Sequence, residues 1–149
     1  MANLTNIRLT RELARLQSED LEGIIIHKPD NLLLWVAQIK GPVNTPFENG
    51  VFNIQLTFDF DYPIKPPSVK FLTPIFHPNI YRDGKICMDI LQSKEWTPAQ
   101  NIRTILMSII SLLMDPNPSS PANREAADLY NNDKIAYESR VREFINTKK

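Results

Sequence analysis

Cysteine is the scarcest chemically reactive residue of this chain, with Cys87 alone among 149 residues. One thiol cannot form an internal disulfide and leaves no cysteine pair for a zinc site, so an oxidising compartment is not implied. Histidine is nearly as rare, because His27 and His77 are the only two. The sequence therefore predicts no metal centre, and its single thiol is either a structural residue or a nucleophile.

Net charge and long apolar runs are also absent. Lysine plus arginine equals aspartate plus glutamate, 17 each, so no overall field would draw the chain to nucleic acid or to acidic lipid. No run approaches about 18 apolar residues, and the first residues lack the apolar core of a signal peptide. We expect a soluble intracellular protein with no nucleic-acid partner and no membrane partner.

The composition is that of an ordinary globular protein, 42% hydrophobic, 23% charged and 9% aromatic. The length fits one domain spanning residues 1–149, and we find no internal repeat, low-complexity stretch or second domain.

The N-terminal segment is predicted to be an amphipathic helix with two stripes. Leucines recur at i, i+4 and i+7 and would be buried, while arginines at a similar spacing lie more than a quarter-turn away. The leucines are Leu9, Leu13 and Leu16, and the arginines are Arg8, Arg11 and Arg15. A basic stripe separate from the buried one either meets a partner or is simply solvated.

Four strand-like runs follow, over residues 24–27, 32–40, 51–59 and 69–73. In the third run Phe52, Ile54, Leu56 and Phe58 alternate with polar residues, which is typical of a sheet with one buried face. The connections are short, carry turn residues and contain no helix. These features predict an antiparallel meander.

Residues 61–68, DYPIKPPS, cannot form a strand or a helix, because three prolines interrupt both. We expect a stiff loop with Ile64 near its tip. An apolar side chain in that position either contacts another molecule or packs back onto the domain.

Three helices are predicted in the last third of the chain. A capping box at residues 97–100 would start a central, buried helix that ends at residues 115–118. Ser120 followed by proline would cap the next helix, and Asn132 would cap the last. The inward side of the last helix would be Ile135, Val141, Phe144 and Ile145.

An ordered set of short motifs surrounds Cys87. They are His77-Pro78-Asn79, Gly84-x-x-Cys87-x-Asp89-Ile90-Leu91, Trp96-x-Pro98 and Pro116-Asn117-Pro118, preceded by Gly41-Pro42 to Gly50-Val51-Phe52 and by Tyr62-Pro63-x-x-Pro66-Pro67. Together they resemble the ubiquitin-conjugating enzyme family over essentially the whole chain. The resemblance implies an α+β fold with an N-terminal helix, a four-stranded antiparallel meander sheet, a central helix and two C-terminal helices.

The resemblance also implies acyl transfer through a covalent intermediate. Cys87 would accept ubiquitin from the ubiquitin-activating enzyme as a thioester and pass it to a lysine amine of a target protein, usually with a RING-type ligase. A thiolate is a good nucleophile near neutral pH and a good leaving group afterwards. The chain has no G-x-x-x-x-G-K-[ST] run, so we expect no cofactor, with ATP spent by the activating enzyme. Such an enzyme would be cytoplasmic and nuclear.

Attack on a thioester creates an oxyanion, which needs a neutral hydrogen-bond donor. By resemblance the side-chain amide of Asn79 supplies it. The alternative is that Asn79 braces its loop through backbone hydrogen bonds, and both roles can hold. His77 precedes a proline inside a turn and is expected to be a structural hydrogen-bonding residue rather than a base.

Two further residues receive catalytic roles from the resemblance. Ser120 lies just after the Pro-Asn-Pro run, where many members have an aspartate that gates the cysteine. A serine cannot act as a carboxylate, so lysine orientation would be weaker or tuned by phosphorylation; its plainer role is a helix N-cap. Asp89 would serve the incoming lysine, although a carboxylate so close to Cys87 opposes thiolate formation.

Partner contacts follow from the resemblance as well. The proline loop and the predicted start of the central helix match the surface where the family meets RING-type ligases, through Ile64, Lys65, Pro98 and Ala99. Arg8 and Arg11 match a first-helix surface shared by ligases and the activating enzyme.

Two departures keep other interpretations open. Residues 92–95 form a segment about one residue longer than in most ubiquitin members, and the SUMO-conjugating branch also has extra residues here. Ile24 falls where some members bind ubiquitin noncovalently through a small polar residue.

The alternatives are the same chemistry with SUMO or another modifier, a non-catalytic adaptor, and a Cys–His hydrolase. Neutral net charge and Asp89 argue against SUMO, the complete cysteine motif argues against an adaptor, and the lack of a base beside Cys87 argues against a hydrolase.

Overall fold

The computed structural model describes residues 3–146, which form an N-terminal helix, a four-stranded sheet and three later α-helices. In chain order the elements are α1 (Leu4–Ser18), β1 (Ile24–Ile26), β2 (Leu34–Lys40), β3 (Val51–Thr57), β4 (Ser68–Phe71), the short 3-10 helix η1 (Asp89–Leu91), α2 (Ile102–Met114), α3 (Arg124–Asn132) and α4 (Lys134–Asn146). The α+β fold predicted from the sequence is confirmed.

The sheet is an antiparallel meander, because strands adjacent in the chain are adjacent in space in the order β1-β2-β3-β4. Ile39 of β2 lies opposite Phe52, and Ile54 lies opposite Phe71 of β4. Phe52 and its alternate neighbours in β3 are buried, whereas the polar residues between them are half-exposed. The predicted alternation therefore gives the sheet one apolar face.

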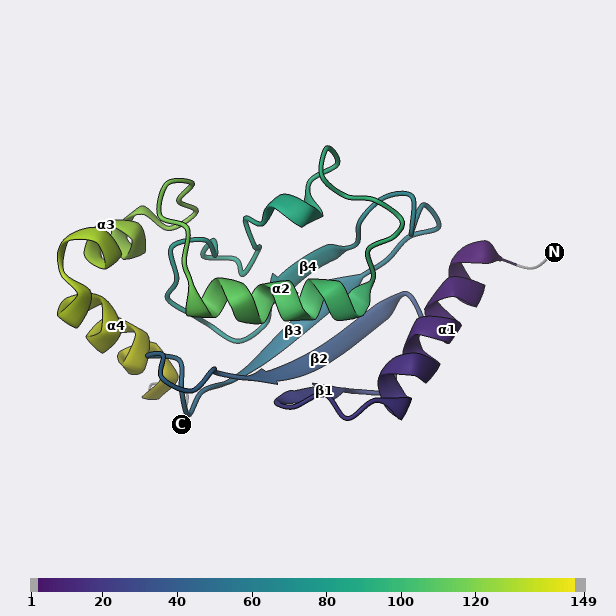
Figure 1. Ribbon diagram of the computed structural model, residues 1–149, viewed down its shortest axis with the longest axis horizontal. Helices are drawn as coiled ribbons and strands as arrows, with labels where there is room; N and C mark the ends of the chain where they lie inside the picture. The colour runs from purple at the N-terminus through teal and green to yellow at the C-terminus, as the bar shows by residue number, and fades with distance from the viewer. Residues whose placement is uncertain (1–2, 147–149) are drawn as a thin grey trace.

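Helix α2 covers this apolar face and forms the centre of the molecule. Figure 1 shows α2 lying across the sheet, with α1 at one end of the molecule and α3 and α4 at the other. Ile102, Ile105 and Leu106 of α2 are fully buried, in one core cluster with Trp35 and Ile54 of the sheet. The central, buried helix expected from the sequence is confirmed.

The start of α2 differs from the prediction. Its N-cap is Asn101, whose Oδ1 accepts a hydrogen bond from the backbone N–H of Thr104 at 2.8 Å. The capping box at residues 97–100 does not form, because Arg8 of α1 donates to the carbonyl oxygens of Pro98 and Gln100 and holds them outside the helix. A contact between distant parts of the chain thus overrides the local cap.

Helix α3 begins after Asn123 rather than at Ser120. The Asn123 side chain accepts a hydrogen bond from the N–H of Ala126 at 3.0 Å. The N–H groups of Ala122 and Asn123 both donate to the carbonyl oxygen of Pro78, which keeps the preceding residues out of the helix. The N-cap role predicted for Ser120 is therefore wrong.

The predictions for α4 are partly wrong. The carboxylate of Asp133, not the side chain of Asn132, accepts the N–H of Ala136 at 3.1 Å. Ile135 is 84% exposed, so it does not belong to the inward side, whereas Val141 is buried as predicted.

The two neighbours Ile24 and Ile25 lie on opposite sides of β1. Ile24 is buried in the core, whereas Ile25 is 52% exposed on the other side. The residue of β1 on the side away from the core is therefore Ile25, and Ile24 belongs to the core.

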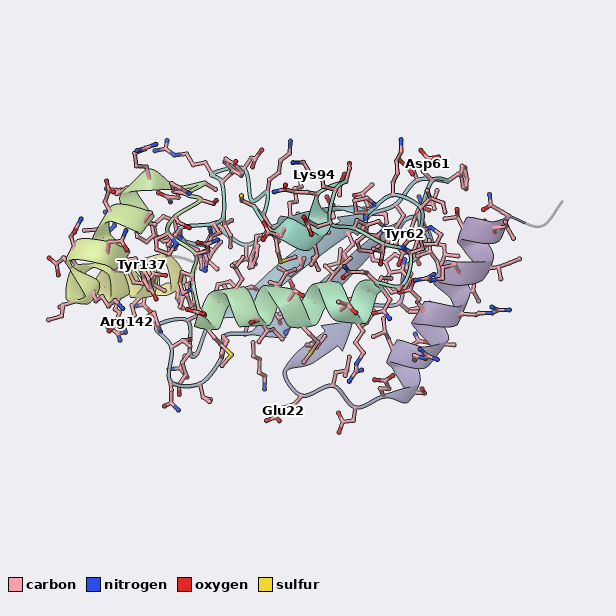
Figure 2. The ribbon with its side chains drawn as sticks, turned by 45° about the horizontal axis from the view of Figure 1, so that its top comes forward. Glu22, Asp61, Tyr62, Lys94, Tyr137 and Arg142 are labelled. Atoms are coloured by element: carbon pink, nitrogen blue, oxygen red, sulfur yellow. The ribbon has the colours of Figure 1, made fainter. Side chains whose placement is uncertain are left out.

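The Tyr137 hydroxyl is the one side-chain polar atom within residues 3–146 that is buried without a hydrogen-bond partner. Its ring packs against Phe76 and Tyr130 at the α3–α4 end of the molecule (Figure 2). Because burying an unpaired hydroxyl costs about 1–3 kcal/mol, Tyr137→Phe is expected to leave the free energy of unfolding unchanged or raised. Urea unfolding measures this, with Tyr130→Phe as the comparison. A destabilisation above about 1 kcal/mol would show that the hydroxyl has a partner.

Candidate active site

Cys87 sits on an extended segment whose side chains alternate between solvent and core. Lys85 is exposed, Ile86 is buried, Cys87 is half-exposed and Met88 is buried. The backbone N–H of Cys87 donates to the carbonyl oxygen of Asn79 at 2.8 Å. Cys87 is thus partly exposed, on a backbone fixed beside the His77-Pro78-Asn79 turn.

Gly84 allows this segment to run against the edge of the sheet. Its φ of +94° lies in the region that favours glycine, and a Cβ at this position would come within 2.1 Å of the carbonyl oxygen of Phe71. The close approach lets the N–H of Phe71 donate to the Gly84 carbonyl at 2.8 Å. The glycine of the cysteine motif therefore fixes the position from which the chain reaches Cys87.

The Asn79 side chain braces the loop that follows α2. Its Oδ1 accepts the N–H of Asn117 at 2.8 Å, and its Nδ2 donates to the carbonyl oxygens of Asn117 at 2.7 Å and Ser120 at 3.1 Å. Asn79 is 1% exposed. The brace, one of the two predicted roles, is confirmed. The oxyanion role stays a prediction. It requires Nδ2 to give up one of its two hydrogen bonds to carbonyl oxygens, and the bond to Ser120 is the longer and weaker of the two.

His77 is a structural residue, as predicted. Its ring is fully buried, with Nδ1 accepting the N–H of Asn79 at 2.9 Å and Nε2 lying 2.8 Å from the carbonyl oxygen of Leu112. Since a carbonyl only accepts, Nε2 carries the hydrogen. Burial lowers the pKa of His77 to about 4. Both ring nitrogens are occupied, so His77 cannot serve as a general base for Cys87.

This buried imidazole predicts acid sensitivity of the fold. The pKa of His77 is about 4 in the folded protein and about 6.5 when unfolded, so the unfolded chain binds more protons between these values. The contribution of neutral, buried His77 to the free energy of unfolding is complete above pH 6.5 and is lost as the pH falls toward 4. Between pH 7 and pH 4.5 the loss is about 2 kcal/mol. Urea unfolding at both pH values should show a smaller difference for His77→Gln, while His27→Gln should retain the wild-type difference. An unchanged difference in His77→Gln would refute the assignment.

The two other predicted catalytic side chains, of Ser120 and Asp89, are both exposed. The backbone carbonyl of Ser120, not its hydroxyl, accepts a hydrogen bond from Asn79 Nδ2. Asp89 begins η1, directly after the segment that carries Cys87. Cys87, Asn79, Ser120 and Asp89 are therefore gathered around one place, and the roles of the last two stay predictions.

The segment at residues 92–95 forms a turn. The N–H groups of Glu95 and Trp96 both donate to the carbonyl oxygen of Gln92, and Figure 2 shows Lys94 at the tip of the loop. The indole Nε1 of Trp96 donates to the carbonyl oxygen of Pro63 at 2.8 Å. Residues 92–95 are therefore exposed to solvent, and Trp96 directly after them contacts the proline loop.

The residues predicted to bind partners lie on one end of the molecule. Ile64 is 72% exposed at the tip of the proline loop, and Pro98 and Ala99 are exposed. Lys65 Nζ lies 3.7 Å from Asp61 Oδ2 at the surface, and this exposed ion pair is weak. A shallow cavity of about 550 Å³ runs between α1 and this surface, lined in part by Arg8, Arg11, Pro98 and Ala99.

Arg8 is more than part of a solvated stripe. Its Nε lies 2.8 Å from a carboxylate oxygen of Glu12, and its Nη2 donates to the carbonyl oxygens of Pro98 and Gln100. Arg11, by contrast, is exposed. Sequence reasoning missed Glu12, although its i+4 spacing from Arg8 was a usable signal for an ion pair.

The described part of the chain contains neither a cluster of potential metal ligands nor a membrane-spanning helix. Residues 3–146 hold no group of three or more histidine, cysteine, aspartate or glutamate residues that could bind a metal ion. None of the helices among these residues is both long and apolar enough to cross a membrane.

Comparisons with known proteins show which family this chain resembles along its length. The model of the ubiquitin-conjugating enzyme family matches residues 8–145. A Candida glabrata protein named ubiquitin-conjugating enzyme E2 2 is 50% identical over 139 residues, covering 93% of this chain and 83% of the relative. Proteins of the same name from Saccharomyces cerevisiae, 49% identical over 93% of this chain and 80% of the relative, and from Neurospora crassa, 45% identical over 97% and 96%, are also similar.

Proposed function

The chain belongs to the ubiquitin-conjugating enzyme family and transfers ubiquitin, and from this premise we propose that Cys87 is the residue that carries ubiquitin as a thioester. The half-exposed thiol on a braced backbone segment is the observation that supports this assignment best. A nucleophile in acyl transfer needs both access and a fixed position, and this cysteine has both.

Two acyl transfers take place at this sulfur in the proposed cycle. The Cys87 thiolate attacks the thioester that the activating enzyme holds, and the sulfur of that enzyme leaves. A target lysine, as a neutral amine, then attacks the new thioester; an isopeptide bond forms, the nitrogen loses one proton to solvent, and the Cys87 thiolate leaves. The chain needs no cofactor for either step, because ATP is spent earlier by the activating enzyme.

The residues around Cys87 have distinct proposed roles. Asn79 would donate one amide hydrogen to the oxyanion of each tetrahedral intermediate. Asp89, exposed beside the cysteine segment, would hold the incoming lysine, and Ser120 would border its path. His77 takes no part in proton transfer, which argues against the Cys–His hydrolase alternative.

As a family member, the chain has ubiquitin, an activating enzyme and ligases as its general partners. We propose that RING-type ligases contact Ile64, Lys65, Pro98 and Ala99, and that the activating enzyme uses the neighbouring α1 surface through Arg11. Arg8 would act in the same surface by holding Pro98 in place. SUMO is not favoured as the modifier, since the relatives above are named for ubiquitin.

The test is a charging assay. The chain is mixed with ubiquitin-activating enzyme, Mg-ATP and either ubiquitin or SUMO with its own activating enzyme, and gels are run with and without thiol reductant. We expect a reductant-sensitive adduct with ubiquitin and none with SUMO. An adduct that resists reductant in the absence of any target, or an adduct with SUMO alone, would refute the proposal.

A further inference from the structure

Exposed apolar side chains gather at the α1 end of the molecule, on segments distant in the sequence. Leu4 of α1 is 78% exposed, Phe60 just before the proline loop is 63% exposed, and Ile64 within that loop is 72% exposed. Thr5 Oγ1 donates to the carbonyl oxygens of Phe60 and Tyr62, which places α1 against the proline loop. Clusters of this kind mark protein contact surfaces.

The carboxylate of Glu12 lies beneath this surface and uses both of its oxygens. Oε2 accepts hydrogen bonds from Arg8 Nε at 2.8 Å and from the Tyr62 hydroxyl at 2.5 Å. Oε1 accepts the backbone N–H of Ile102 at 2.7 Å. The side chain is only 11% exposed. Figure 2 shows Tyr62 between α1 and the start of α2, in line with these contacts.

These bonds join three segments at one group. Glu12 belongs to α1, Tyr62 to the proline loop and Ile102 to the first turn of α2, whose N–H groups have no partner inside the helix. Arg8, oriented by Glu12, holds the carbonyl oxygens of Pro98 and Gln100. Removing the carboxylate would leave the buried Tyr62 hydroxyl, the N–H of Ile102 and the Nε of Arg8 without their acceptor, which loosens all three segments.

The cysteine segment depends on a different set of hydrogen bonds. Its backbone is fixed by Asn79, which is fixed in turn by His77 and by the loop at residues 117–120. Glu12 makes no hydrogen bond with any of these residues among those described. A change at Glu12 should therefore alter how partners bind without altering the chemistry at Cys87.

We propose that Glu12 is a positioning residue for partner binding. It fixes α1, the proline loop and residues 98–100 relative to one another, so that the ubiquitin-activating enzyme, which we place on α1, meets all three segments in one fixed arrangement. The inference rests on the proposed function, because the partner used to test it is the ubiquitin-activating enzyme.

The experiment measures charging kinetics as a function of the concentration of this chain. For Glu12→Ala we expect the KM of the activating enzyme for this chain to rise about tenfold, a loss of about 1.4 kcal/mol in binding, with kcat unchanged. Discharge of the purified thioester to free lysine, without any ligase, should proceed at the wild-type rate. Tyr62→Phe removes one of the three bonds and should raise KM less. Glu22→Ala, an exposed acid in the loop after α1 (Figure 2), is the matched control and should change nothing.

Two results would overturn the inference. One is a wild-type KM in folded Glu12→Ala; the other is a loss of lysine discharge as large as the rise in KM, which indicates general damage. If Glu12→Ala does not fold, Glu12→Gln and Tyr62→Phe decide by the same two readouts. Failure of the wild-type chain to charge at all would refute the proposed function instead, so the two failures are distinguishable.

Discussion

Cys87→Ala is expected to form no thioester with ubiquitin at any concentration of activating enzyme. The methyl group of alanine offers no nucleophile, and this position holds the only thiol of the chain. The half-exposed side chain contributes little to the core, so the free energy of unfolding should change by less than about 1 kcal/mol. The expected effect on activity is therefore complete loss in a folded protein, measured as disappearance of the reductant-sensitive band.

Cys87→Ser separates the nucleophile from its surroundings. A serine hydroxyl is a much weaker nucleophile than a thiolate at neutral pH, so any adduct should form slowly. Once formed it would be an oxygen ester, which survives thiol reductant and is cleaved by mild alkali. A reductant-sensitive adduct in either variant would show that Cys87 does not carry the ubiquitin.

The sheet was predictable from the sequence because its pattern is local. Phe52, Ile54 and Leu56 alternate with polar residues, and every one of them faces the core. The interior of α2 was predictable for the same reason, since Ile102 and Ile105 recur at helical spacing and are buried. Periodicity reports which side of an element is covered, and it needs no knowledge of what covers it.

Element boundaries were not predictable where distant residues set them. Residues 97–100 have the composition of a helix start, yet Arg8, 92 residues before Gln100, takes the carbonyl oxygens that would enter the helix. Ser120 is followed by proline as a first helical turn would be, yet the Pro78 carbonyl holds the residues that follow it. Short-range rules cannot weigh such contacts, because the partners become neighbours only in the folded chain.

The candidate site was predictable to the extent that its residues lie close together in the sequence. Cys87, Asn79 and Asp89 share one stretch, and they lie together in the fold. The hydrogen bonds from Asn79 to Asn117 and Ser120 join residues about a quarter of the chain apart. The sequence predicted that Asn79 braces a loop but did not identify these partners. Glu12 was missed because its partners Tyr62 and Ile102 belong to other segments.

Helix α2 connects the two hydrogen-bonded groups. Its first N–H, from Ile102, donates to Glu12 below the partner surface. Near its other end, the carbonyl oxygen of Leu112 accepts from His77 beside the active site. One side of the helix is buried against the sheet between these points. The partner surface and the cysteine segment are thus fixed to one rigid element but held by separate bonds, so substitutions can perturb them independently.

Asn79→Ala is expected to charge with ubiquitin normally. The rate of its discharge to free lysine should fall about 100-fold, the usual effect of removing one oxyanion donor. The variant also loses three hydrogen bonds to Asn117 and Ser120, so some loss of stability accompanies the loss of rate. The measurement is the single-turnover decay of purified thioester at saturating lysine, together with the free energy of unfolding.

Asn123→Ala is the control that separates the two roles of Asn79. Asn123 lies in the same region and caps α3 through its side chain, so its replacement costs about 1 kcal/mol and leaves the side-chain amide of Asn79 in place. If Asn79 acts on the oxyanion, Asn79→Ala discharges far more slowly than Asn123→Ala when the two are compared at conditions of equal stability. If the two discharge alike, Asn79 contributes only its brace, and the oxyanion must be stabilised by backbone N–H groups that Asn79 holds in place.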